Sequence, residues 1–140
     1  MNDTIKILAE FLTGQNIECR IPEDNEDVIW FSLKLPSHDA AATFYVNYNA
    51  ETQVLLIMAS RMVKFSVVGP DLLLLLNEFN ADPSVFGCKM FIDQVGEVTV
   101  SYSAFLRSEP LAPQTVDLID IVLKAADRYY GRVAAFAGEG

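Results

Sequence analysis

The chain is poor in the residues that most often carry metal or nucleophilic chemistry. Its 140 residues include one histidine and two cysteines, Cys19 and Cys88, which lie far apart in the sequence. A zinc site needs a compact group of Cys and His ligands, and neither cysteine has a spacing that indicates a pair or a ligand motif. The acidic segment 22–27 lacks the central glycine and the terminal glutamate of a calcium loop. We therefore expect no metal, no cofactor, and two reduced, partly buried thiols.

Basic residues are scarce as well. The chain has 10 Lys and Arg against 19 Asp and Glu, so its formal net charge is −9. A field of this sign repels phosphate backbones and anionic lipid, which argues against nucleic acid or a membrane surface as a partner. The N-terminus has no basic region followed by an apolar stretch, and the longest apolar runs fall far short of the roughly 20 residues that span a bilayer. These absences favour a cytoplasmic protein.

Motifs of catalysis and nucleotide binding are missing. The seven glycines are scattered, with neither a dinucleotide fingerprint nor a phosphate-binding loop. His38 lies between Ser37 and Asp39, but a catalytic triad needs three side chains that converge in space. Neighbours in a loop do not normally achieve this, so we interpret His38 as a solvated histidine. Asp93 and Glu97 flank a turn, where turn chemistry explains the aspartate, and we expect no catalytic residue and no enzyme activity.

Apolar residues are abundant, at 51% against 21% charged. They are enough for one domain over residues 1–140 to bury about two-thirds of its unfolded surface. Apolar periodicity and turn signals predict an α+β fold, in which helices pack on an antiparallel sheet, with the element order α-β-β-β-α-β-β-α. We expect helices over 3–13, around the leucine run 72–76 and over 113–136, and strands over 29–35, 42–49, 52–60, 86–93 and 97–106.

The third predicted strand contains an unbroken apolar run from Val54 to Ala59. A strand that is apolar on both faces indicates a central place in the sheet, with other elements packed on either side. We therefore place it in the middle of the sheet.

Five consecutive leucines, Leu72 to Leu76, follow Pro70 and Asp71, which suit the first turn of a helix. At about 100° per residue, the leucines go once around the helix axis. A sheet buries only about half of that circumference, so we expect a subunit interface at Leu74 and Leu75. The alternative is that the long C-terminal helix covers the other side. The full set of interface candidates is Leu72, Leu74, Leu75, Leu118, Ile121 and Tyr129.

Aromatic residues gather on the first two predicted strands. Such a group can form a peptide-binding surface. Cross-strand packing in the core explains the same residues about as well, so both interpretations stay open. The candidates are Trp30, Phe44, Tyr45 and Tyr48.

Three parts of the chain together resemble one known family. They are LLNEFN at 75–80, FID at 91–93 with GEV at 96–98, and ADRYY at 126–130. With the element order, they are similar to the YbjN-like family, bacterial proteins described as sensory-transduction regulators, whose fold is similar to that of type III secretion chaperones. The resemblance implies a sheet with helices packed on it, frequent dimers, and protein contacts in place of catalysis.

We accordingly expect a non-enzymatic protein-binding module, a regulator or chaperone-like protein that acts as a homodimer and binds a further protein partner. One alternative is a dedicated type III secretion-type chaperone, which would hold an effector in extended form. An alternative of another class is a small-ligand-binding protein or an enzyme, which would require a closed pocket with convergent polar groups.

Overall fold

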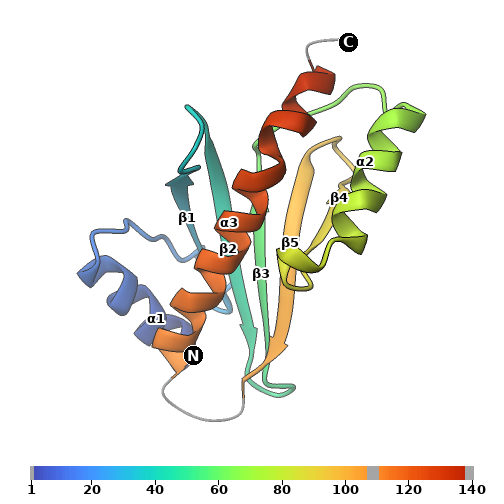
Figure 1. Ribbon diagram of the computed structural model, residues 1–140. Helices are drawn as coiled ribbons and strands as arrows, with labels where there is room; N and C mark the ends of the chain where they lie inside the picture. The colour runs from blue at the N-terminus through green and yellow to red at the C-terminus, as the bar shows by residue number, and fades with distance from the viewer. Residues whose placement is uncertain (1, 107–110, 138–140) are drawn as a thin grey trace.

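The structure, a computed structural model, describes residues 2–106 and 111–137, and its elements follow the order expected from the sequence (Figure 1). The α+β fold class is confirmed. The helices are α1 (Asp3–Gly14), α2 (Pro70–Ala81) and α3 (Leu111–Ala137), with a 3₁₀ turn, η1 (Pro83–Val85), after α2. The strands are β1 (Val28–Lys34), β2 (Ala41–Asn49), β3 (Val54–Ser60), β4 (Lys89–Ile92) and β5 (Val98–Phe105). No helix within the described ranges has the length and apolar character needed to cross a membrane.

The five strands form one sheet in the order β1-β2-β3-β5-β4, with every neighbouring pair antiparallel. The first three strands are the predicted meander. β3 lies in the middle of the sheet, as its apolar sequence indicated. The long connection from β3 through α2 to β4 leaves β5 to pair with the central strand.

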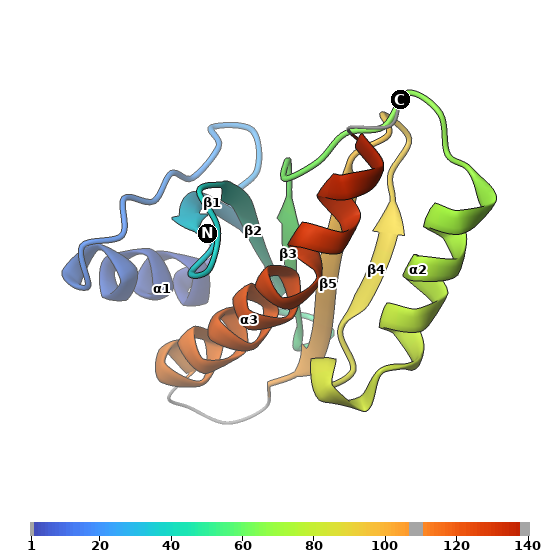
Figure 2. The ribbon, with the colours of Figure 1, turned by 45° about the horizontal axis from the view of Figure 1, so that its top comes forward.

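All three helices lie on the same face of the sheet, as both views of the ribbon show (Figures 1 and 2). α3 crosses the middle strands diagonally, α1 packs near β1 and β2, and α2 packs near β4. Alternate strand residues point toward the helices and are buried, as the pleat of a strand requires. In β3 these buried residues are Leu55, Ile57 and Ala59.

The opposite face of the sheet is not covered by any of the described helices. In β3, the side chains of Val54, Leu56 and Met58 belong to that face and are only half-buried. The expectation that elements pack on both sides of β3 is therefore not met within the described chain, because α1, α2 and α3 all gather on one side. We call the strand side chains that point away from the helices the open sheet face.

The fourth strand is shorter than predicted. The backbone N–H of Ser84 donates a hydrogen bond of 2.8 Å to Asp82, which starts η1. Phe86 then ends the turn in the left-handed conformation, with φ 57°. β4 consequently begins only at Lys89, three residues later than the apolar pattern indicated.

Candidate functional site

A row of five side chains, one from each strand, crosses the open sheet face. Trp30 of β1 is paired with Tyr45 of β2, and Tyr45 is paired with Met58 of β3. The row continues through Ser101 of β5 to Lys89 of β4. Directly opposite residues of antiparallel strands have Cβ atoms about 5 Å apart. The first three side chains thus form a continuous aromatic and apolar strip.

The strip borders a hollow of about 430 Å³. Tyr45, Met58 and Phe91 are apolar and aromatic parts of its lining. The hydroxyls of Ser60 and Thr99 also belong to the lining, and they form a hydrogen bond of 3.1 Å with each other. Because these buried hydroxyls already have a partner, they do not require a polar ligand. The hollow therefore suits an apolar side chain of a binding partner.

Only two of the four aromatic candidates lie on the open sheet face. Trp30 and Tyr45 are half-buried there, and the guanidinium carbon of Arg20 lies 5.4 Å from the centre of the Trp30 ring. Phe44 and Tyr48 point toward the helices and are buried in the core. The candidate peptide-binding surface is thereby reduced to Trp30 and Tyr45. Alternation along β2 places Tyr45 opposite Phe44 and Tyr48, but it does not say which face is covered, and only the pairing of the strands puts Trp30 beside Tyr45.

Sequence reasoning missed most of the residues that line this hollow, among them Met58, Phe91 and Arg61. Met58 belongs to the apolar run of β3, so the run itself does not distinguish it from its buried neighbours. Phe91 comes from β4 and reaches the hollow because β4 pairs with β5 beside β3. Arg61 follows β3 directly and is exposed. No local sequence signal places these three residues together.

α2 forms a second apolar surface. Leu73 and Leu74 are 54% and 67% exposed. α3 packs on one side of α2, where the ring of Tyr129 meets that of Phe79 edge-on, with 4.8 Å between their centroids. The C-terminal helix therefore covers α2 in part and leaves this leucine pair exposed. The side chains that α2 buries are Leu72, Leu75, Leu76 and Phe79.

The remaining interface candidates lie on α3. Tyr129 is buried inside the chain, so it supports α2 from within. Leu118 and Ile121 are half-buried in the N-terminal half of α3, which Figure 2 shows beside α1 and away from α2. Among the six candidates, Leu74 is thus the one that is largely exposed next to the core of α2. Whether it forms a subunit interface stays a prediction.

A hydrogen-bond network fixes the orientation of α2. The Tyr129 hydroxyl donates to Oδ2 of Asp82 at 2.7 Å, while Oδ1 accepts from both the backbone N–H and the hydroxyl of Ser84. These hydrogen bonds, that of Tyr129 foremost, lower the pKa of Asp82 to about 2. Arg132 of α3 forms an ion pair with Glu78 of α2. The exposed leucines are therefore held on a helix that is anchored at its C-terminal end.

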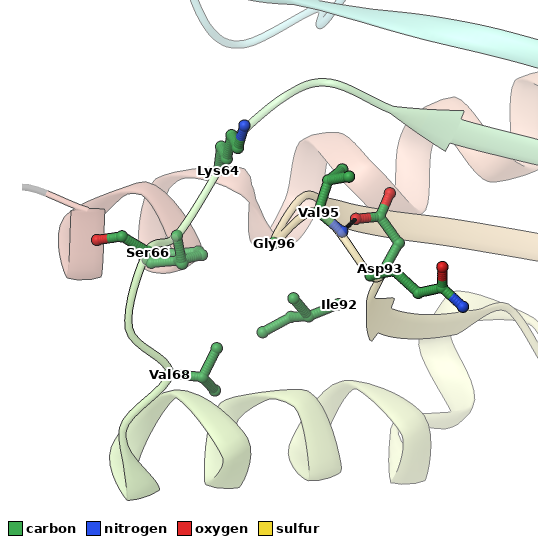
Figure 3. A pocket seen from close by; sticks show the side chains of 9 residues that line it. Lys64, Ser66, Val68, Ile92, Asp93, Val95 and Gly96 are labelled. Carbon is green, nitrogen blue, oxygen red and sulfur yellow. Dashed lines mark hydrogen bonds between the residues drawn. The ribbon is translucent and has the colours of Figure 1, made fainter.

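A second hollow, of about 540 Å³, lies between the segment after β3 and the β4–β5 hairpin (Figure 3). Asp93 accepts hydrogen bonds from the backbone N–H groups of Val95 (3.0 Å) and Glu97 (2.9 Å), which is the turn role that the sequence predicted. In Figure 3, the side chains of Lys64, Ser66 and Asp93 do not point toward one another. The polar groups drawn there lack the convergence expected of a small-ligand site.

The metal-binding residue types are dispersed over the described part of the chain, where no three His, Cys, Asp or Glu side chains group closely enough to hold an ion. His38 is not solvated as expected. Its Nε2 lies 3.0 Å from the carbonyl oxygen of Asp127, and its ring packs 4.8 Å from that of Tyr130, which docks the β1–β2 loop on α3. Cys19 and Cys88 are both free, and burial raises the pKa of the Cys88 thiol to about 11.

The one-sided packing of helices on this sheet defines the class of protein, an α+β domain with the type III secretion chaperone-like fold. A chain of the ExsC–ExsE complex matches with a TM-score of 0.64 and 19% sequence identity, over 91% of both chains. A chain of the heterodimeric ExoU–SpcU complex, from the type III secretion system of Pseudomonas aeruginosa, matches with a TM-score of 0.50 and 17% identity. That match covers 95% of this chain and 94% of the other. At these identities the likeness shows the fold alone.

The chain belongs to the YbjN family. The sequence model of this family, described as "Putative bacterial sensory transduction regulator", matches residues 4–135. The match confirms the resemblance indicated by the motifs in α2, the β4–β5 hairpin and α3. No curated protein sequence matches the chain.

Proposed function

We propose that this chain is a non-enzymatic, cytoplasmic protein-binding module, a regulator or chaperone-like protein that acts as a homodimer. The observation that carries the proposal is the exposure of two apolar surfaces, the open sheet face and the Leu73–Leu74 pair of α2. Contiguous apolar surface on a folded domain marks contacts with other molecules. Membership of the YbjN family supports a regulatory role, and the two similar solved structures described above are complexes of two proteins, which supports a protein partner.

The exposed side of α2 is the surface that we assign to the homodimer. A two-fold interface places the same patch of both subunits together, so the leucine pair of one chain would meet the same pair of its copy. Val67 and Val68, in the segment before α2, are 80% and 40% exposed and extend the apolar surface. Leu72 and Leu75 would support this interface from the core, since they are buried under it.

Light scattering coupled to size-exclusion chromatography tests the homodimer. We expect the wild type to have twice the 15.5 kDa mass of one chain, and Leu74→Glu to have the mass of a single chain. The matched control is Ile7→Glu, because Ile7 is 56% exposed on α1 and receives the same charge without touching α2. A Leu74→Glu variant that keeps the mass of the dimer would contradict the assignment of this surface.

A pull-down at native expression level, read by mass spectrometry, tests protein binding itself. We expect one stoichiometric partner with the wild type. A partner that becomes insoluble when this protein is removed would identify a dedicated chaperone, as in the type III secretion alternative. A partner that stays folded without it would identify a regulator. Recovery of no partner would leave self-association or binding of a small ligand as the better explanation.

A further inference from the structure

The charges of the sheet differ in sign from those of the chain as a whole. The chain has 19 Asp and Glu, yet the five strands contain no carboxylate. Their only charged residues are Lys34 in β1 and Lys89 in β4. Both alternate with helix-facing neighbours and therefore belong to the open sheet face, one at each edge of the sheet. The strands thus contribute only positive charge to the face that the helices leave uncovered, although the protein as a whole is acidic.

Two arginines add to this positive charge. Arg20 lies over the Trp30 ring, and Arg61 lines the 430 Å³ hollow together with Met58 and Tyr45. The lining of the hollow also includes two carboxylates, Asp93 and Glu97. Oδ1 of Asp93 is already bonded to the backbone of the hairpin turn, and neither carboxylate forms an ion pair with Arg61 within the described ranges.

Two cations of the helices, Lys124 and Arg132, have a carboxylate partner, whereas the cations of the open sheet face have none in the part of the chain that the structure describes. On the helical side, Lys124 forms an ion pair of 2.7 Å with Asp120, and Arg132 forms one with Glu78. Within the described ranges, none of the four cations of the open sheet face forms an ion pair with a carboxylate; they are Arg20, Lys34, Arg61 and Lys89. Their charges are therefore available to an anionic partner.

We propose that the open sheet face binds an acidic, extended segment of a partner protein. Apolar side chains of the segment lie on the strip of Trp30, Tyr45 and Met58, and its carboxylates pair with the four cations around the strip. This inference rests on the proposed protein-binding function and adds the chemistry of the partner.

Other occupants fit this face less well. A second copy of the same face would bring the four cations against an identical set, and like charges across an interface are unfavourable. Nucleic acid would be repelled by the net charge of −9, because its phosphates extend well beyond the four cations of the open sheet face. A short acidic segment interacts mainly with the charges that it touches, since salt screens more distant charges beyond about 8 Å.

The hollow supplies the apolar part of the recognition. Ser60 and Thr99 satisfy each other through their mutual hydrogen bond. Tyr45, Met58 and Phe91 form the apolar and aromatic part of the lining, beside the charged side chains of Arg61, Asp93 and Glu97. Burial of one large apolar side chain there would anchor the segment, and the surrounding cations would select carboxylates beside the anchor.

The single tryptophan of the chain provides a direct readout, because Trp30 is part of the strip. We would select binders from a random-sequence peptide library displayed on phage, with the full chain immobilised. The most enriched peptide is then synthesised together with a counterpart in which every Asp and Glu is replaced by Lys. We expect enrichment of Asp and Glu beside large apolar residues, a change in Trp30 fluorescence on binding, and affinity about tenfold or more weaker for the counterpart.

Charge-reversal variants locate the binding site. We expect the double variant Lys89→Glu and Arg61→Glu to bind the acidic peptide about tenfold or more weakly than the wild type does. Both side chains are exposed, so the fold should persist, which circular dichroism checks. The matched control is Lys6→Glu together with Arg128→Glu, because both residues are exposed on helices and the pair undergoes the same change in charge. It should leave the affinity of the peptide unchanged.

Each contrary outcome can be told apart from a failure of the protein-binding function. The inference would be overturned if the enriched peptides lack acidic residues or if no peptide is enriched. It would also be overturned if the Lys89→Glu and Arg61→Glu changes leave the affinity for the peptide unchanged. The pull-down would still report independently on whether the protein has a partner. An oligothymidine probe that binds as tightly as the acidic peptide, or more tightly, at physiological salt would also overturn it, because the face would then bind phosphate.

Discussion

The hydroxyl of Tyr129 in α3 donates a hydrogen bond of 2.7 Å to Oδ2 of Asp82, which ends α2. The two residues are 47 positions apart in the sequence. The other carboxylate oxygen of Asp82 caps η1 through Ser84. One carboxylate therefore joins the end of α2, the turn after it and the long C-terminal helix.

Acid should weaken this junction. Hydrogen bonds from Tyr129 and Ser84 favour the ionised form of Asp82, so its pKa in the folded protein is about 2, below the ordinary value of 3.8. A lowered pKa contributes stability above the unfolded value, and this contribution is lost as the pH falls from about 4 to about 2. We expect Tyr129→Phe to lower the free energy of unfolding more at neutral pH than at about pH 2, measured by urea denaturation.

The control for this experiment is Tyr130→Phe. Tyr130 is the next residue on α3, and its ring packs on His38. This variant keeps the ring and leaves the Asp82 junction intact, so its effect should be the same at about pH 4 and about pH 2, the interval over which the Asp82 contribution is lost. A loss from Tyr129→Phe that is the same at both pH values would contradict the role assigned to the Asp82 carboxylate.

Leu72 and Leu74 should respond differently to the same substitution. Leu72 is 2% exposed and Leu74 is 67% exposed. Glutamate at position 72 would place an unpaired charge in the core and should cost about 3–5 kcal/mol of folding free energy. Glutamate at position 74 would keep its charge in water in the single chain. Far-UV circular dichroism and urea denaturation of dilute samples compare the two, and a stably folded Leu72→Glu protein would show that α2 packs through another side.

Asn80 should protect the edge of the sheet. Its side chain amide donates to the carbonyl oxygen of Met90 (3.1 Å), and its side chain oxygen accepts from the Met90 backbone N–H (2.8 Å). Asn80→Ala would leave both backbone groups of this edge strand without that partner, which should cost about 1–3 kcal/mol and favour edge-to-edge association.

Amide hydrogen exchange at Met90 and light scattering measure the two effects of Asn80→Ala. Asn77→Ala is the control, because Asn77 is an exposed residue of the same helix. If the Met90 amide is protected from hydrogen exchange equally well in Asn80→Ala and in the wild type, the Asn80 hydrogen bonds do not stabilise this edge strand.

Gly96 should not tolerate a side chain. It has φ 87°, and a Cβ atom at this position would lie 2.2 Å from the carbonyl oxygen of Phe65. Phe65 in turn donates a backbone hydrogen bond of 2.8 Å to the carbonyl oxygen of Gly96. Gly96→Ala should therefore separate the hairpin from the segment after β3 and cost about 2 kcal/mol or more.

Thermal unfolding measures the loss of stability in Gly96→Ala, with Gly14→Ala as the control. A Cβ at Gly14, the last residue of α1, would meet no atom within 4 Å. We expect that variant to be as stable as the wild type or slightly more stable. Similar melting temperatures for Gly96→Ala and the wild type would rule out the close contact with Phe65.

Local patterns predicted most of the fold. The alternation in β1 and β2, the turn chemistry of Asp93 and the Pro70 start of α2 are all settled by a few neighbouring residues, and the structure has them as predicted. The start of β4 was wrong by three residues, because the cap made by Asp82 and the left-handed Phe86 interrupt an apolar run that looks continuous. The docking of His38 on α3 depends on Asp127 and Tyr130, which are too distant in the sequence for a local pattern to connect with it.

The sequence by itself determined the order of the elements, the central place of β3, the acidic net charge and the motifs of the family. Periodicity says which residues of one strand share a face, so it places Phe44 and Tyr48 opposite Tyr45 on β2. The prediction nevertheless took the four aromatic residues together, and periodicity does not say which face is covered or with which of them Trp30 of β1 lies. Only the tertiary structure decided this, because the covering helices come from distant parts of the chain and all pack on one side. The same packing buried Leu75 and left Leu74 exposed, and it brought cations from separate segments onto one apolar face.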